Sequence, residues 1–263
     1  MRAFDSKKPT VTVIGAGVSG LMAALLLERK NLNVQLVDEN VDTPAPYELP
    51  YICSSRVSTL LERDLPEIAR ALAHEGARKV SIAEILRFRF PGVAITAKDE
   101  STSFLCFSRS LLQRVLLEEV KRSRIELVRA RVSGLLREGN VVNGVELGAT
   151  RLESELTLDT TGAGSTRSAW LEKLGIGPER FQTYGPRYVS LAKFYRTTLP
   201  SSSIQFDLAS GQNFRGGVYP LEGDRFAIAL VVPEQVLPEG LDRAAAEKFF
   251  AEAAVTLKEH KGF

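Results

Sequence analysis

Three glycines and one acidic residue near the start of the chain have the spacing of a dinucleotide-binding site. Gly15, Gly17 and Gly20 form the pattern G-x-G-x-x-G, and Asp38 follows 23 residues after Gly15. In such a motif the first glycine allows a tight turn, the second lets the backbone approach a pyrophosphate, and the third lets a helix pack closely on a strand. A carboxylate at Asp38 can accept both hydroxyls of an adenosine ribose. We therefore predict that this stretch binds a dinucleotide.

The residues around the glycines predict a strand, a helix and a second strand that would hold them in place. Val11–Ile14 is an unbroken β-branched run, typical of a strand buried on both faces of a parallel sheet. A helix over Ser19–Lys30 would turn the positive end of its dipole toward the phosphates. The second strand, residues 33–37, leads directly into Asp38. Glu39 falls one place later and is expected to point to the other face, which makes Asp38 the preferred ribose ligand.

A second informative stretch is LDTTGAGSTRSAWLEKLG, where a short strand leads into a turn and a helix. Asp159 and Gly162 lie in the turn. Ser165 is the predicted N-cap of a helix that continues to Leu174, and Gly175 would end it. This arrangement predicts a second edge facing a phosphate or a ribose, beside the first. An ordinary strand-to-helix turn without a ligand is the alternative.

The stretch SRSLLQRVLLEEVK, residues 108–121, predicts an amphipathic helix that begins at Ser108. Arg109 would then lie in the first turn, where a cation opposes the helix dipole. A bound anion such as phosphate would explain that placement. A solvated arginine without a ligand explains it equally well.

Composition excludes several other classes of function. The net charge of +2 over 263 residues gives no electrostatic case for binding nucleic acid. No apolar run approaches the roughly 18 residues of a membrane span, and glycines interrupt the only candidate for a signal peptide. Two cysteines and two histidines are too few for a disulfide framework or a metal cluster, so we expect no metal. The expected location is the cytoplasm.

The whole pattern predicts an α/β fold with two domains. Residues 1–175 would form a Rossmann-like dinucleotide-binding domain with a parallel sheet and an excursion at about 41–107. Residues 176–263 would form a smaller, mainly antiparallel sheet on the substrate side and a final helix over 241–259. Within these domains we expect helices at 54–63 and 66–74 and short strands at 90–98 and 103–107. Asn143-Gly144 predicts the turn of a hairpin.

With these stretches in place, residues 9–232 resemble the FAD-dependent monooxygenase superfamily with the aromatic-hydroxylase fold. VTVIGAGVSG with Asp38 is similar to its adenosine-binding fingerprint, and the helix start at Ser108-Arg109 is similar to its arginine beside the cofactor. LDTTGAGSTRSAWLEKLG looks like its second flavin motif, in the variant found among epoxidases and hydroxylases of polyketide-like substrates. This variant carries a Trp-Leu pair.

The resemblance implies an enzyme that binds FAD and uses NAD(P)H and O₂ to oxidise a small organic substrate, aromatic or polyene-like. The flavin would carry the chemistry, and the protein would position the substrate and exclude water. No catalytic acid or base can be named, and the family need not have one. The candidate cofactor ligands are Gly15, Gly17, Ser19, Gly20, Asp38, Glu39, Arg109, Asp159 and Gly162.

One feature of the family has no match in this sequence. A third flavin motif, a Gly-Asp-Ala sequence before a turn rich in proline and glycine, is missing after residue 232. We therefore expect a truncated product, self-association, or a complementing chain that completes the flavin site. A flavin-dependent reductase, an NAD-dependent dehydrogenase and a non-catalytic nucleotide-binding remnant remain the alternatives to a monooxygenase.

Overall fold

The computed structural model describes residues 7–41, 48–162, 165–177, 185, 187–198, 206–210, 214–237, 244, 246–247, 250–251 and 255. Its contacts divide the chain into two compact units. The first comprises Met1–Pro46, Leu61–Ala71 and Ser110–Gln182, and the second comprises Tyr47–Leu60, Leu72–Arg109 and Thr183–Phe263. The division into domains at residue 175 stays a prediction.

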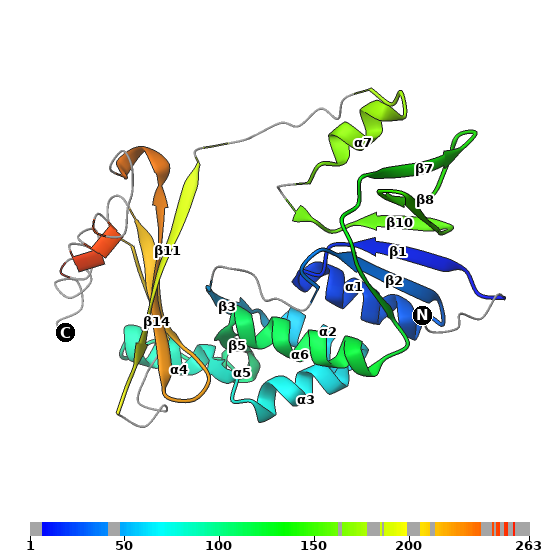
Figure 1. Cartoon of the computed structure of the whole chain (residues 1–263). Coiled ribbons are helices and arrows are strands. Elements are labelled where there is room, and N and C mark those ends of the chain that lie inside the picture. Colours follow the sequence, from blue (N-terminus) through cyan, green and yellow to red (C-terminus); the bar gives the residue numbers. More distant parts are fainter. Residues whose placement is uncertain are drawn as a thin grey trace. The chain divides into compact units, whose positions relative to one another are not determined.

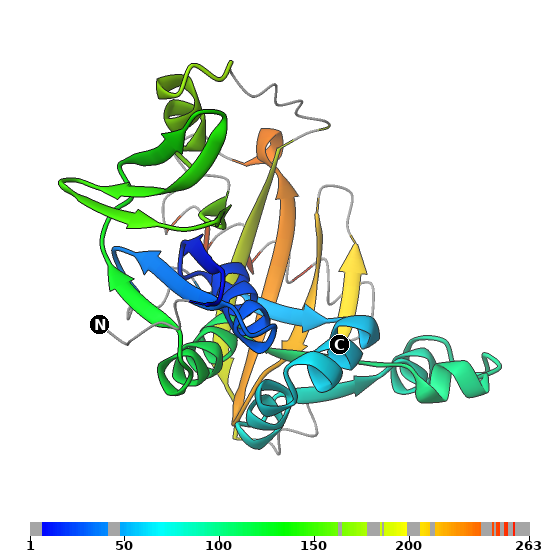
Figure 2. The same ribbon diagram turned by 90° about the vertical axis from the view of Figure 1, so that its right-hand side faces the viewer.

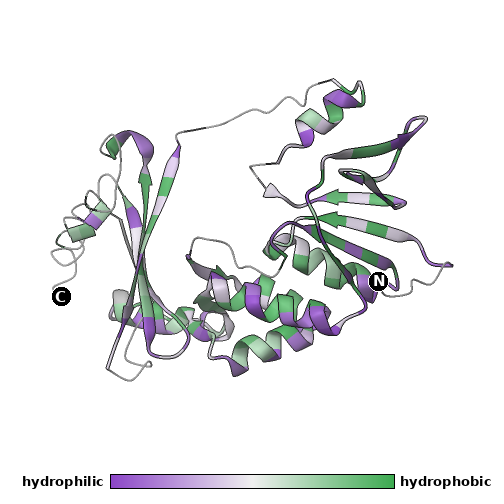
Figure 3. Cartoon of the chain, in the orientation of Figure 1, coloured by the Kyte–Doolittle hydropathy of each residue, from purple (hydrophilic) through white to green (hydrophobic). Residues whose placement is uncertain are grey.

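A four-stranded parallel sheet lies at the centre of the first unit, in the order β10-β1-β2-β6 (Figure 1). Its strands are β1 (Thr10–Ile14), β2 (Asn33–Asp38), β6 (Glu126–Arg129) and β10 (Leu156–Asp159). Both faces of the central strands are buried: Val13 and Leu36 have no exposed area, and on the opposite face the Thr12 hydroxyl donates to Oε1 of Gln35 at 3.1 Å. Helix α1 (Val18–Arg29), hydrophobic along most of its length (Figure 3), packs against β1 and β2. The predicted strand-helix-strand unit is confirmed.

A smaller antiparallel sheet in the first unit is built from β7 (Gly134–Glu138), β8 (Val141–Leu147) and β9 (Thr150–Glu153). The turn predicted at Asn143-Gly144 is wrong, because both residues lie inside β8. The chain reverses instead between β7 and β8, where Gly139 has a φ of 59°. A glycine is required at position 144 because the backbone of β9 comes close to it: a Cβ there would lie 2.1 Å from the carbonyl oxygen of Leu152.

The second unit contains an antiparallel sheet in the order β3-β5-β4, formed by Pro50–Cys53, Ser103–Ser108 and Arg78–Ser81. Strand β5 confirms the strand predicted at 103–107. The strand predicted at 90–98 is wrong, because residues 90–96 form the loop between α4 (Ile82–Arg89) and α5 (Ala97–Ser101), and α5 takes the last two residues. Thr96 and Asp99 form a reciprocal capping box, which fixes the start of α5 where the β-branched residues suggested a strand.

A four-stranded antiparallel sheet in the order β11-β14-β13-β12 forms the rest of the second unit (Figure 2). Its strands are Tyr188–Arg196, Arg225–Pro233, Arg215–Pro220 and Asp207–Ser210, and a 3-10 helix over Glu234–Val236 follows β14. The predicted antiparallel sheet is confirmed. The helix predicted over 241–259 lies mostly outside the described residues. Phe250, which is described, is buried against Leu230 and Val232.

Three helices contribute residues to both units: α2 (Ser55–Asp64), α3 (Pro66–His74) and α6 (Arg109–Arg122). They confirm the predicted helices, and α7 (Arg167–Lys173) confirms the one after the second motif. In the part of the chain that the structure describes, no helix is long and apolar enough to cross a membrane. Nor do the described residues gather three or more potential metal ligands in one place.

Candidate cofactor site

The two glycine-containing motifs lie beside each other at the carboxyl edge of the parallel sheet. Strand β10 pairs with β1 so that Asp159 is the partner of Ile14. Just past this pair the backbone N–H of Thr160 donates to the carbonyl oxygen of Ile14 at 2.9 Å. The Thr160 hydroxyl donates to the carbonyl oxygen of Gly15 at 3.0 Å. The carboxyl edge of such a sheet is where α/β proteins bind nucleotides.

The three glycines differ in what the fold requires of them. Gly15 has a φ of 101°, which other residues rarely adopt, and Gly20 lies so close to the turn that a Cβ would come within 1.8 Å of the Gly15 carbonyl oxygen. Gly17 has an ordinary φ of −70°, and nothing lies within 4 Å of where its Cβ would be. The fold therefore explains two of the glycines. The role of Gly17 toward a pyrophosphate stays a prediction.

Asp38 turns its carboxylate toward this glycine-rich turn. Its Oδ2 accepts the backbone N–H of Ala16 at 2.7 Å, and its Oδ1 accepts the N–H of Asn40 at 2.7 Å. A carboxylate offers about four lone-pair positions, so both oxygens can still accept a hydroxyl. Glu39 is exposed and its Oε1 lies 3.8 Å from Nε of Arg131. The structure thus places Asp38, and not Glu39, against the turn.

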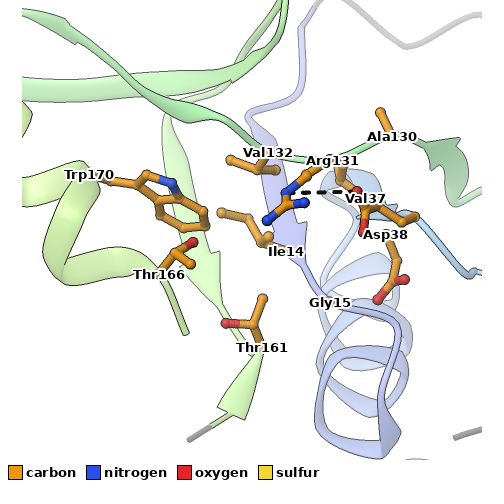
Figure 4. Close-up of a pocket in the computed structure, with 11 residues that line it drawn as sticks. Ile14, Gly15, Val37, Asp38, Ala130, Arg131, Val132, Thr161, Thr166 and Trp170 are labelled. Carbon is orange, nitrogen blue, oxygen red and sulfur yellow. Dashed lines mark ion pairs between the residues drawn. The ribbon is translucent and has the colours of Figure 1, made fainter. Parts of the chain in front are cut away.

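A cavity of about 250 Å³ opens at this edge of the sheet (Figure 4). Three of the candidate ligands line it, namely Gly15, Asp38 and Glu39. The other lining residues are Ile14, Val37, Ala130, Arg131, Val132, Thr161, Thr166 and Trp170. The lining is mixed: Ile14, Val37, Val132 and Trp170 contribute apolar surface, and other residues contribute carboxylate, hydroxyl and guanidinium groups. A flat heterocycle that carries a ribose needs both kinds of surface.

Sequence reasoning missed most of this cavity. Ala130, Arg131 and Val132 follow β6, whose carboxyl end lies next to that of β2. The signal that could have found them is topological, because ligands of a parallel sheet contact the loops after several of its strands. Trp170 is 6% exposed and belongs to the core cluster with Ile14 and Val145, so its place depends on tertiary packing.

Asp159 organises the second turn with its own carboxylate. Its Oδ2 accepts the Ser165 hydroxyl at 2.5 Å, and its Oδ1 accepts the hydroxyl and the N–H of Thr161 at 2.6 and 3.0 Å. Burial alone would raise the pKa of Asp159, but these hydrogen bonds and the nearby Arg167 together hold that pKa below its ordinary value. The carboxylate is therefore ionised at neutral pH and fixes the turn that carries Gly162.

Three of the remaining candidates in the first unit are placed around α1 and the second turn. Ser19 is exposed in the first turn of α1, Gly20 is buried beneath it, and Gly162 has a φ of 83°. Neither Ser19 nor Gly162 lines the cavity. Their contact with a cofactor stays a prediction.

Arg109 belongs to the second unit, where it begins α6 and its backbone N–H donates to the carbonyl oxygen of Leu49 at 2.9 Å. The residue before it, Ser108, is fully buried. Glu222 accepts both the Ser108 N–H, at 3.0 Å, and the Ser108 hydroxyl, and also pairs with Arg225. Glu222 thus holds the residue that precedes α6. The role of Arg109 toward a cofactor stays a prediction.

A second cavity, of about 660 Å³, lies in the second unit beside β11. Apolar residues supply much of its lining, including Leu49, Phe194 and Phe250. Lys193 and Glu247, which form an ion pair with each other, supply charge. Its full lining is Glu48, Leu49, Ser190, Leu191, Ala192, Lys193, Phe194, Ala246, Glu247 and Phe250.

Comparison with protein families matches residues 10–183 to the family model described as glucose inhibited division protein A. A search of curated proteins found no match. Among solved structures, the chain is similar to PqsL, a probable FAD-dependent monooxygenase from Pseudomonas aeruginosa. The TM-score is 0.64 at 20% identity, over 87% of this chain and 62% of that one.

Two further solved structures have the same fold. The peptidyl tryptophan dihydroxylase QhpG matches with a TM-score of 0.59 at 19% identity, over 94% of this chain and 50% of that one. A triple mutant of the flavin-dependent brominase Bmp2 matches with a TM-score of 0.64 at 17% identity, over 91% and 60%. The chain thus spans 50% to 62% of the length of these three proteins. The predicted α/β fold of FAD-dependent monooxygenases is confirmed.

Proposed function

We propose that this chain, which belongs to the glucose inhibited division protein A family, is an FAD-dependent oxidoreductase. The observation that carries the proposal is the Asp38 carboxylate, which is hydrogen-bonded to the glycine-rich turn and lines the same cavity as Gly15. These features fit an adenosine diphosphate moiety, with its pyrophosphate at the turn, its ribose at Asp38 and its adenine in the cavity. The fold shared with flavin-dependent enzymes supports FAD as the dinucleotide.

The protein's own contribution begins with binding. The backbone N–H groups at the start of α1 would face the pyrophosphate, where the helix dipole favours negative charge. The turn held by Asp159, which carries Gly162, starts beside Gly15, where Thr160 lies close to it, and would border the middle of the cofactor. The bound flavin supplies the redox chemistry.

The specific reaction we propose is a monooxygenation that uses NAD(P)H and O₂. PqsL is described as a probable monooxygenase and QhpG as a dihydroxylase, and these descriptions support the same class here. The cavity beside β11 supports a small organic substrate, because its volume of about 660 Å³ and the apolar part of its lining suit a ring or a polyene. The charged pair of Lys193 and Glu247 would orient a polar substituent.

The test is a titration of the purified chain with FAD and with NAD, followed by the visible absorbance of the flavin and by calorimetry. We expect FAD to bind more tightly than NAD. Tighter binding of NAD would assign the site to a dehydrogenase instead. Oxygen consumption with NADH or NADPH, measured with and without candidate substrates, then separates a monooxygenase from a flavin-dependent reductase.

A further inference from the structure

Arg131 lies in the proposed adenosine site, and the fold does not depend on its side chain. It follows β6, lines the cavity, and has a side chain that is 75% exposed. Figure 4 shows its guanidinium among the lining residues, between the Trp170 side of the cavity and Asp38. Its partner is Glu39, with Nε and Oε1 separated by 3.8 Å. An ion pair this exposed contributes little to stability, so the core does not explain the residue.

Part of the cavity lining offers an aromatic ring a nonpolar surface. Ile14, Val37 and Val132 are buried apolar residues of the lining, and Trp170 is a buried aromatic one. Each of these side chains can pack against a purine. Arg131 is the exposed member of the lining with a long, planar head group, and a guanidinium stacks well on aromatic faces.

We propose that Arg131, which pairs with Glu39, is a specificity-determining residue whose guanidinium stacks on the exposed face of the adenine ring. This inference rests on the proposed function, because it assumes that the adenosine half of the cofactor occupies the cavity. The alternative role for an arginine here is to bind a 2′-phosphate on the ribose. The Asp38 carboxylate lines the same cavity and would repel that phosphate, and Glu39 already offsets the charge of Arg131.

The chain carries its own reporter for the experiment. Trp170 is the only tryptophan in the sequence, and it lines this cavity. Its fluorescence should change when adenine enters, so 5′-AMP can be titrated without flavin or catalysis. FMN, which lacks adenine, serves as the ligand control. Arg131→Ala and Arg131→Lys are the test variants. Arg151→Ala, an exposed arginine in β9 that does not line the cavity, is the matched control.

We expect Arg131→Ala to weaken the binding of 5′-AMP and of FAD by the same factor, roughly 2- to 30-fold, the range of a cation stacked on a ring. Arg131→Lys should weaken both nearly as much, because an ammonium cannot stack as a plane does. Arg151→Ala should match the wild type. Thermal melting without ligand should be unchanged in all three variants.

Two results would overturn the inference. One is an unchanged affinity of Arg131→Ala for 5′-AMP when the wild type binds both 5′-AMP and FAD. The other is tighter binding of adenosine 2′,5′-bisphosphate than of 5′-AMP by the wild type, with the advantage retained in Arg131→Lys, since that pattern marks a phosphate ligand. A wild type that binds neither FAD nor 5′-AMP would reject the proposed function itself.

Discussion

The Asp38 carboxylate accepts a hydrogen bond from the backbone N–H of Ala16 at 2.7 Å, which ties the end of β2 to the glycine-rich turn after β1. The same carboxylate retains the capacity to accept ribose hydroxyls. One side chain therefore shapes the turn and would recognise the ligand. Its neighbour Glu39 instead points its carboxylate toward Arg131, with which it forms an ion pair.

Replacing Asp38 and Glu39 one at a time should show which of the two acids binds the ribose. Hydrogen bonds to a charged group are worth about 1.5–3 kcal/mol, so Asp38→Ala should weaken FAD binding roughly ten- to hundredfold. Glu39→Ala removes a neighbouring carboxylate that does not contact the turn, and its effect should stay below about threefold, within the worth of an exposed ion pair. Calorimetric titration of both variants measures the difference. Equal losses would show that Asp38 is not the ribose ligand.

Gly17 and Gly20 should fail in different ways when each is enlarged. Gly17→Val should fold, because nothing in the protein lies within 4 Å of its added Cβ, and should lose FAD binding, because its side chain would fill the proposed space of the pyrophosphate. Gly20→Ala should lose thermal stability, since its Cβ would collide with the Gly15 carbonyl oxygen. Melting curves without ligand, combined with FAD titrations, distinguish the two. A Gly17→Val protein that binds FAD normally would contradict the assignment of this space.

The hydrogen-bonded turn at Asp159 predicts a dependence of stability on pH. The pKa of Asp159 in the folded chain is lowered relative to the unfolded chain. Its stabilising effect is therefore complete above the unfolded value of about 3.9 and is lost as the pH falls through the folded value. The melting temperatures of the wild type and Asp159→Asn, measured from neutral pH downward, should converge below that unfolded value. Glu62→Gln, at an exposed position, should show no such convergence.

Glu222 should contribute more to stability than its place in a surface turn suggests. Burial raises its pKa, but hydrogen bonds from Ser108 and its own backbone, with the charge of Arg225, lower the pKa overall, so the group is ionised at neutral pH. Glu222→Gln should cost about 1.5–3 kcal/mol of unfolding free energy, the worth of a hydrogen bond to a charged group. Asp224→Asn, two residues later in an exposed pair with Arg196, should cost less than about 1 kcal/mol. Urea denaturation measures both, and similar losses would refute the distinction.

The sequence predicted best where local pattern and burial agree. Three elements formed as the local sequence predicted: the strand at Val11–Ile14, the glycine-rich turn after it, and the amphipathic helix α6. The strand at 90–98 failed because Thr96 and Asp99 cap a helix more strongly than the β-branched residues favour a strand without a partner. The side-chain hydrogen bonds of the cap thus mattered more than the content of β-branched residues.

Asn143-Gly144 failed for the opposite reason. The pair is a good turn sequence, but Gly144 is required where the backbone of β9 comes close to β8, and no local pattern reveals that neighbour. The cavity was missed in the same way. Arg131 and Trp170 reach it only through the pairing of β6 with β2 and the packing of α7, which are tertiary facts.

The pairing of β10 with β1 joins Val11 to Leu156, across 145 residues of chain, and this separation affects folding. Contacts between distant residues slow folding, because the chain must be closed into a long loop before they form. A ribosome that adds about 5–20 residues per second exposes the glycine-rich turn many seconds before its neighbouring strand exists. A nascent chain thus holds a strand-helix-strand unit whose turn lacks Thr160 and the second motif. A dinucleotide can then stabilise only the completed first unit, so adding it should slow unfolding without accelerating the earliest steps of folding.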